Sequence, residues 1–192
     1  MLEKFSRKIA VWLIKSGILE NDNSELYGYA IQYLLLIIIP TINFFAYCIA
    51  TLNIIIGFII LFSFLLIRKY SGGYHCKSSS VCLIFSTIVL ITMVFYANLI
   101  NFSPVIIITI ILCELELIIK GPIISINHDI SDKERIIYRK YLYVILAVYD
   151  IIMALFIYFN KIHLACSIAI VIITCSLAHM ICMIGKNKEV YY

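Results

Sequence analysis

Long apolar runs, separated by short polar segments, set the pattern of this chain. Each run holds about 16–23 residues, close to the length that an α-helix needs to cross the hydrocarbon core of a bilayer. The pattern therefore predicts six membrane-spanning helices, at residues 29–50, 52–67, 81–100, 104–119, 141–159 and 162–184. The second and fourth spans are short, so an arrangement of five spans with one short segment re-entrant stays open.

The segment before the first predicted span has an amphipathic pattern instead. Leu2, Phe5, Ile9, Trp12 and Leu13 recur at helical spacing, while the basic residues of the segment avoid that stripe. Such a helix lies in the membrane interface with its apolar face toward the lipid. The segment does not resemble a signal peptide, because its charges are spread along it and no uninterrupted apolar stretch leads to a cleavage site.

The composition agrees with a lipid environment. Hydrophobic residues make up 64% of the chain and charged residues 14%, whereas soluble domains have about 45–50% and about 25%. No linker rich in proline, glycine or serine divides the 192 residues. We therefore expect one all-α membrane domain, residues 1–192, in which an interfacial helix and turn (1–25) precede a polytopic bundle of six transmembrane helices (26–192).

Basic residues cluster in alternate loops of this arrangement, which predicts its orientation. Because Lys and Arg mark the cytoplasmic side, both termini are expected in the cytoplasm. The net charge of +4 then reflects topology and attraction to anionic lipid rather than nucleic-acid binding. Lys161 alone falls on the other side. The remaining 14 of the 15 basic residues are Lys4, Arg7, Lys8, Lys15, Arg68, Lys69, Lys77, Lys120, Lys133, Arg135, Arg139, Lys140, Lys186 and Lys188.

The seven cysteines do not form a disulfide pattern. Their number is odd, five of them besides Cys82 lie inside predicted spans, and no CxxC pair has zinc-site spacing. Cys76 and Cys82 differ from the others, because they flank the start of the third predicted span beside a histidine and several cations, a setting that lowers a thiol pKa. The four histidines share no HxxxH or HExxH spacing, so neither a metal site nor a cofactor is expected.

The stretch from Arg68 to Cys82 carries the most distinctive chemistry. It reads RKYSGGYHCKSSSVC and leads into the third predicted span. Gly72 and Gly73 allow a sharp reversal of the backbone, and Ser78–Ser80 offer hydroxyl groups for helix capping. We therefore expect Cys82 in the first turn or two of that helix, where its thiolate would feel the positive end of the helix.

His75 and Cys82 are the candidate catalytic pair, since a cysteine peptidase needs a thiolate and a base that later protonates the leaving amine. In one regular helix, seven steps would separate their Cα atoms by about 10 Å, and the side chains could hardly meet. The pattern therefore predicts that His75 lies in a loop folded back over the helix start. By spacing alone, a surface histidine and an inert cysteine are the commoner case. Cys76 competes as the nucleophile, but adjacent side chains point apart.

Four residues match a family pattern in both type and spacing, between the second and third spans: Arg68, Gly73, His75 and Cys82. With them the chain resembles the accessory gene regulator protein B family, AgrB. The resemblance covers nearly the whole chain and includes the amphipathic N-terminus, the six spans and the cytoplasmic termini. A second similar patch consists of Gly121, Pro122, Asn127, Glu134 and Arg135. The chain departs from the pattern in the acids of its central loop, Asp129, Asp132 and Glu134, and in Cys76.

The resemblance implies a membrane-embedded cysteine endopeptidase of the cytoplasmic membrane of Gram-positive bacteria. Such proteins remove the C-terminal tail of an AgrD-like pro-peptide through a thioester acyl-enzyme and help to form a cyclic thiolactone pheromone for quorum sensing. His75 and Cys82 match the family's catalytic residues, on the cytoplasmic side. The family also favours a homodimer.

Further site residues follow from the same resemblance. Arg68 and Gly73 match positions that the family requires, and Gln32 matches a family glutamine and is a candidate oxyanion donor. The residues expected to bind acidic parts of the substrate are Arg68, Lys77, Lys133 and Arg135. For these cations, orientation of the protein and contact with lipid phosphate are the simpler alternatives.

Ionisable residues inside the predicted spans support a rival interpretation. Glu114, Glu116 and Asp150 would form the ion path of a small transporter. The chain lacks the internal repeat and paired broken spans that point to a transport site. A membrane scaffold without chemistry is a third possibility. For Asp150 a structural polar contact is the favoured role, and for His163 and His179 satisfied packing is favoured over ligand binding.

Overall fold

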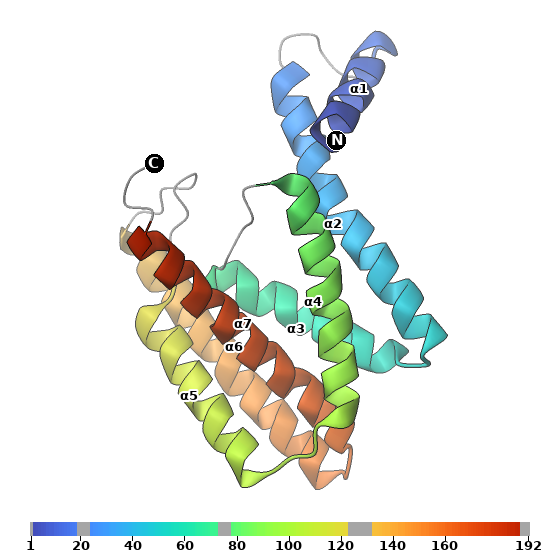
Figure 1. Cartoon of the computed structure of the whole chain (residues 1–192). Coiled ribbons are helices and arrows are strands. Elements are labelled where there is room, and N and C mark those ends of the chain that lie inside the picture. Colours follow the sequence, from blue (N-terminus) through green and yellow to red (C-terminus); the bar gives the residue numbers. More distant parts are fainter. Residues whose placement is uncertain (1, 19–23, 73–77, 123–131, 189–192) are drawn as a thin grey trace.

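The computed structural model describes residues 2–18, 24–72, 78–122 and 132–188, and these form seven α-helices and no strand (Figure 1). The predicted all-α fold is confirmed, and each apolar run lies largely within one helix. The helices are α1 (Leu2–Lys15), α2 (Ser24–Ala50), α3 (Ile54–Ser71), α4 (Ser79–Leu99), α5 (Pro104–Lys120), α6 (Asp132–Tyr158) and α7 (Ile162–Lys188).

Five of these helices, α2, α3, α4, α6 and α7, are long and apolar enough to cross a membrane. The chain is therefore a multi-pass membrane protein. α5 has 17 residues, which corresponds to a length of about 25 Å, and Glu114 and Glu116 interrupt its apolar sequence. The count of six spans and the orientation of the termini stay predictions.

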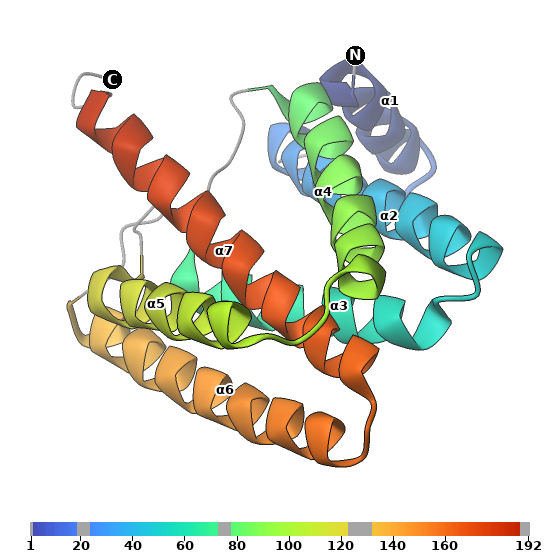
Figure 2. The ribbon, with the colours of Figure 1, turned by 60° about the horizontal axis from the view of Figure 1, so that its bottom comes forward.

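α7 is the central helix of the bundle. It packs against α3, α4, α5 and α6, and in Figure 2 it runs between α4 and the α5–α6 pair. Most of its buried side chains are small. Small side chains let neighbouring membrane helices pack closely, which favours their association where the hydrophobic effect does not drive it. They include Ala165, Cys166, Ser167, Ala169, Cys175 and Ser176.

α1 packs against the start of α2 through small residues rather than through its apolar stripe. Ser6 and Ala10 are buried, whereas Phe5 and Trp12 are 55% and 62% exposed. The stripe is therefore left open to lipid, which is the arrangement expected of an interfacial helix.

α2 and α3 form a hairpin with a close contact near its turn. The turn follows Ala50, and Leu52 adopts a positive φ of 58°. A methyl group at Gly57 of α3 would lie 2.6 Å from Sγ of Cys48 on α2. The absence of a side chain at Gly57 therefore allows the two helices to touch.

Large apolar side chains cover the outer faces of the bundle. On α3 they include Ile55, Phe58 and Phe62, and on α5 they include Val105 and Ile108, each more than half exposed. Water would penalise apolar surface of this extent, whereas lipid solvates it. The exposure pattern thus agrees with the assignment of these helices to the membrane.

The C-terminal ends of α3, α5 and α7 and the N-terminal ends of α4 and α6 point to the same side of the bundle, here called the basic end (Figure 1). The start of α4 lies apart from the other four ends, beside α2. Arg68, Lys120 and Lys133 lie at this end, and Lys161 lies at the opposite end, between α6 and α7. The basic clusters of separate loops are thus brought together in space, as the alternating pattern predicts.

Candidate active site

Cys82 lies in the first turn of α4, at the basic end. Ser78 is the N-cap residue, with extended backbone angles, but its hydroxyl makes no capping hydrogen bond. The N–H of Cys82 donates to the Ser78 carbonyl oxygen at 2.9 Å and so begins the hydrogen bonding of the helix. The side chain is half-buried and not disulfide-bonded. The predicted position of Cys82 near the positive end of a helix is confirmed.

The end of α3 is the described part of the chain that precedes α4. Gly72 has a φ of 75°, and its N–H donates to the Arg68 carbonyl oxygen at 3.1 Å. A positive φ of this size suits glycine, and α3 ends here. The predicted reversal of the chain beyond Gly72 lies outside the described residues. Gly73, His75, Cys76 and Lys77 lie outside the described residues, so the encounter of His75 with Cys82 stays a prediction.

Arg68 lies in the last turn of α3, four residues before Gly72. Its guanidinium carbon is 5.5 Å from the centre of the Phe64 ring, within the range of a cation–π contact. It also lies near enough to Cys175 of α7 to act on it electrostatically. The half-buried Arg68 is therefore positioned between α3 and α7, and its binding to a substrate stays a prediction.

Gln32, the predicted oxyanion donor, is half-buried in α2. α2 packs against α4, the helix that carries Cys82, so the two residues belong to neighbouring helices. The role of Gln32 stays a prediction.

The predicted substrate-binding cations of α6 lie in its first turn, where Lys133 and Arg135 are both exposed. Arg135 lines a groove of about 750 Å³ at the basic end. The groove is both apolar and basic, and its other lining residues are Ile118, Ile136, Arg139, Lys140 and Tyr143.

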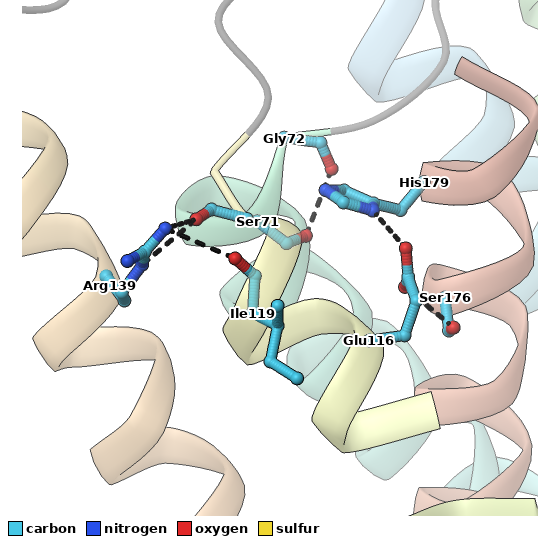
Figure 3. Close-up of polar contacts among 8 residues, drawn as sticks. Ser71, Gly72, Glu116, Ile119, Arg139, Ser176 and His179 are labelled. Atoms are coloured by element: carbon cyan, nitrogen blue, oxygen red, sulfur yellow. Dashed lines mark hydrogen bonds and ion pairs between the residues drawn. The ribbon is translucent and has the colours of Figure 1, made fainter. Parts of the chain in front are cut away.

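Arg139 has a defined structural task beside this groove. Its Nε and Nη2 donate to the Gly121 carbonyl oxygen at 3.2 and 3.1 Å, and Nη2 also donates to the Ile119 carbonyl oxygen at 3.3 Å (Figure 3). These carbonyls belong to the end of α5, where a helix leaves acceptors unpaired. Arg139 thus ties α6 to the end of α5.

A buried polar cluster joins α5 to α7 near the same end. Nδ1 of His179 is 2.8 Å from Oε1 of Glu116, and the Ser176 hydroxyl donates to Oε2 at 2.9 Å (Figure 3). His179 and Ser176 are fully buried, and Glu116 is 8% exposed. The second imidazole nitrogen, Nε2, is buried without a partner among the described residues.

The sequence contained each member of this cluster but not the pairing. The polar residues Ser176 and His179 lie three apart on one helix face, and Glu116 is a carboxylate inside a predicted span. Only the packing of α5 against α7 brings them together. The His179 imidazole, expected to be a satisfied packing residue, has a hydrogen-bond partner among the described residues at Nδ1 but not at Nε2.

The other intramembrane acids form a separate contact. Glu114 of α5 and Asp150 of α6 interact through a side-chain hydrogen bond, which is the polar helix contact favoured for Asp150. In the part of the chain that the structure describes, no group of three metal-ligating side chains is found.

The comparison with known families bears on this arrangement. A family model described as accessory gene regulator B matches residues 6–183. The chain belongs to the AgrB family. AgrB proteins take part in the processing of agr quorum-sensing peptides, with an AgrD-type pro-peptide as the substrate. No match was found among curated proteins or among solved structures.

In this AgrB chain, the described site residues Gln32, Arg68 and Cys82 lie on three helices, α2, α3 and α4. His75 lies outside the described residues. Cys82 and Arg68 lie at helix ends on the same side of the bundle, and Gln32 lies on α2, which packs against the helix of Cys82. Glu116 and His179 add a buried polar pair at the end of α3 that the motif does not contain.

Proposed function

We propose that this AgrB chain is a cysteine endopeptidase with the catalytic pair His75 and Cys82. It removes the C-terminal tail of an AgrD-type pro-peptide through a thioester acyl-enzyme and so leads to a cyclic thiolactone peptide. The proposal includes six spans, a basic end that faces the cytoplasm, and assembly as a homodimer.

The observation that carries the proposal is the position of Cys82. It lies half-buried in the first turn of a membrane helix, at the end of the bundle where basic residues gather. The positive end of the helix dipole favours a thiolate at such a place. α3 ends at Ser71, and Gly72, three residues before His75 in the sequence, has a φ of 75°.

The first step forms the acyl-enzyme. His75 takes the proton of the Cys82 thiol, and the thiolate attacks a backbone carbonyl carbon of the pro-peptide. The Gln32 amide is the proposed donor to the oxyanion that forms. The carbon–nitrogen bond then breaks, His75 returns its proton to the amine of the leaving tail, and a thioester joins the peptide to Cys82.

The second step exchanges one thioester for another. A thiol of the bound peptide loses its proton to His75 and attacks the Cys82 thioester, and Cys82 leaves as a thiolate that is reprotonated. The bond types before and after are the same, so the step needs little driving force. Exclusion of water prevents hydrolysis, and the lipid boundary at the first turn of α4 provides that exclusion.

The cations of the basic end are suited to hold an acidic peptide. Arg68, Lys77, Lys133 and Arg135 are the proposed contacts, and the forked guanidinium donors match carboxylates. The apolar lining of the groove beside Arg135 suits a peptide that has apolar side chains as well as acids.

Replacement of Cys82 tests the proposal directly. Membranes that contain Cys82→Ala and an AgrD-type pro-peptide with a C-terminal tag are expected to release the tag at least about 1,000-fold more slowly than wild type. Cys182→Ala is the matched control, because Cys182 is also half-buried but lies on α7. Normal release by Cys82→Ala, with the protein present in the membrane, would exclude this mechanism.

The acyl-enzyme can be trapped. A pro-peptide whose own cysteine is replaced by serine lacks the thiol for the second step, so the peptide is expected to accumulate on Cys82. Mass spectrometry should show the adduct, and hydroxylamine should remove it because it cleaves thioesters. Accumulation on any other residue would contradict the assignment of Cys82.

A further inference from the structure

In the buried cluster of Glu116, Ser176 and His179, one ring nitrogen of His179 has no hydrogen-bond partner among the described residues. Glu116 accepts from the Ser176 hydroxyl, so its remaining oxygen is available to accept from Nδ1 of His179 at 2.8 Å. A carboxylate held in this way fixes the orientation and tautomer of an imidazole. Nε2 of the neutral ring is then an acceptor, and it is buried without a partner among the described residues.

A buried acceptor without a hydrogen bond is unfavourable, so its surroundings matter. Figure 3 shows the His179 ring directed toward the end of α3, where Ser71 and Gly72 lie. Ser71 is fully buried, and its hydroxyl donates to the carbonyl oxygen of the adjacent Gly72 at 3.0 Å. Rotation of the Ser71 hydroxyl about its Cα–Cβ and C–O bonds would let it donate to Nε2 of His179 instead.

We propose that His179 is a positioning residue of the peptidase reaction, which accepts the Ser71 hydroxyl at Nε2 and so anchors the end of α3 from which the chain continues to His75. The proposal rests on the proposed function of His75 and Cys82. Glu116 and Ser176 hold the imidazole, and His179 holds α3.

The proposed hydrogen bond between Ser71 and His179 can affect the reaction rate because Ser71 is close to His75 in the sequence. Ser71 is the last residue of α3 and lies four positions before His75 in the sequence, so a shift of Ser71 is passed on through few bonds to His75. Catalysis requires the base and the nucleophile to be held within a few tenths of an ångström, and a displacement of about 1 Å lowers turnover by about 100-fold. An anchor at Ser71 restricts the base without touching the substrate.

The test uses His179→Asn and Ser71→Ala in the full-length protein. Asparagine keeps an N–H near the position of Nδ1, so Glu116 stays paired while the acceptor at Nε2 is lost. We expect kcat for tag release to fall by about 100-fold with KM unchanged. Ser71→Ala should lower kcat similarly, and the double variant should be no slower than either single variant, because both remove one hydrogen bond.

Alkylation of Cys82 by iodoacetamide is the second readout. Its rate against pH, followed by mass spectrometry of the Cys82 peptide, reports how closely His75 approaches the thiol. Both variants should shift this profile toward that of His75→Ala. A merely structural defect would lower the amount of folded protein and leave the profile of the remaining protein unchanged, which would overturn the proposal.

His163→Asn is the matched control, since His163 is an exposed histidine near the start of the same helix. It should behave as wild type in both assays. If His179→Asn fails to accumulate in membranes, the test of the hydrogen bond rests on Ser71→Ala alone. This variant removes one hydroxyl and no charge, so it is the milder change to the fold. Wild-type kcat and pH profile in Ser71→Ala would overturn the proposal, as would multiplicative effects in the double variant.

Failure of this inference is distinguishable from failure of the proposed function. If Cys82→Ala still releases the tag, the peptidase mechanism itself is wrong. If Cys82→Ala is inactive while Ser71→Ala and His179→Asn match wild type, the mechanism stands and only the anchor is rejected.

Discussion

The close contact between α2 and α3 makes Gly57→Ala a sensitive test of the fold. The added methyl group would lie 2.6 Å from Sγ of Cys48, against the 3.4 Å at which ordinary contact begins, a shortfall of about 0.8 Å. Cys48 and its neighbour Phe44 are fully buried, so neither side chain has free space to move into. The helices must therefore separate at this point or Cys48 must leave its rotamer.

The magnitude follows from two opposing terms. Overpacking of a buried contact costs about 1–3 kcal/mol, and replacing glycine by alanine within a helix gains about 1 kcal/mol. Gly28→Ala measures this gain without overpacking, because its methyl group would make only ordinary contacts, with Cγ and Cα of Arg7 at 3.4 and 3.8 Å. We expect Gly57→Ala to be less stable than Gly28→Ala by about 1–3 kcal/mol.

The assay is thermal unfolding of the purified protein in detergent, followed by circular dichroism. For a chain of this length, each kcal/mol corresponds to about 2–4 °C in Tm. The double variant Cys48→Ala/Gly57→Ala should recover most of the loss, because the sulfur atom that clashes is gone. Equal Tm values for Gly57→Ala and Gly28→Ala, or no recovery in the double variant, would refute the contact.

Three further predictions follow from other parts of the structure. Arg139→Ala removes three hydrogen bonds to the end of α5 and should lower the free energy of unfolding by about 1–3 kcal/mol, whereas loss of tag release without a change in Tm would argue for a direct role instead. Trp12 is the single tryptophan, so its emission reports on α1, and lipids with brominated chains should quench it strongly; emission like that of tryptophan in water would place α1 away from the bilayer. Asp150→Asn should leave tag release within about tenfold of wild type, because the Glu114 contact survives as an amide hydrogen bond; abolished activity would favour a function built on intramembrane acids.

The sequence predicted the helices well because lipid imposes a simple rule. A spanning segment must be apolar along most of its length, and the apolar runs accordingly mark α2 to α7. The rule does not predict where a helix continues into polar sequence. For this reason the start of α6 at Asp132, nine residues before its apolar run, was not predicted. The 17-residue α5 is ambiguous for the same reason, since its length lies at the lower limit for a span.

The candidate site was predictable only where local sequence decides structure. The first turn of α4 at Cys82 and the end of α3 at Gly72 both follow from residues next to them in the chain. The contact between Glu116 and His179 joins residues 63 positions apart, and no periodicity within one helix reveals which other helix it will face.

The central position of α7 has a consequence for biosynthesis. This helix follows in the chain every helix that it touches, α3, α4, α5 and α6. As the ribosome delivers the segments in order, the earlier helices enter the lipid without their common neighbour, and the pocket for Glu116 stays open on the side where Ser176 and His179 belong. Formation of this buried cluster is therefore a late event, completed when α7 is inserted.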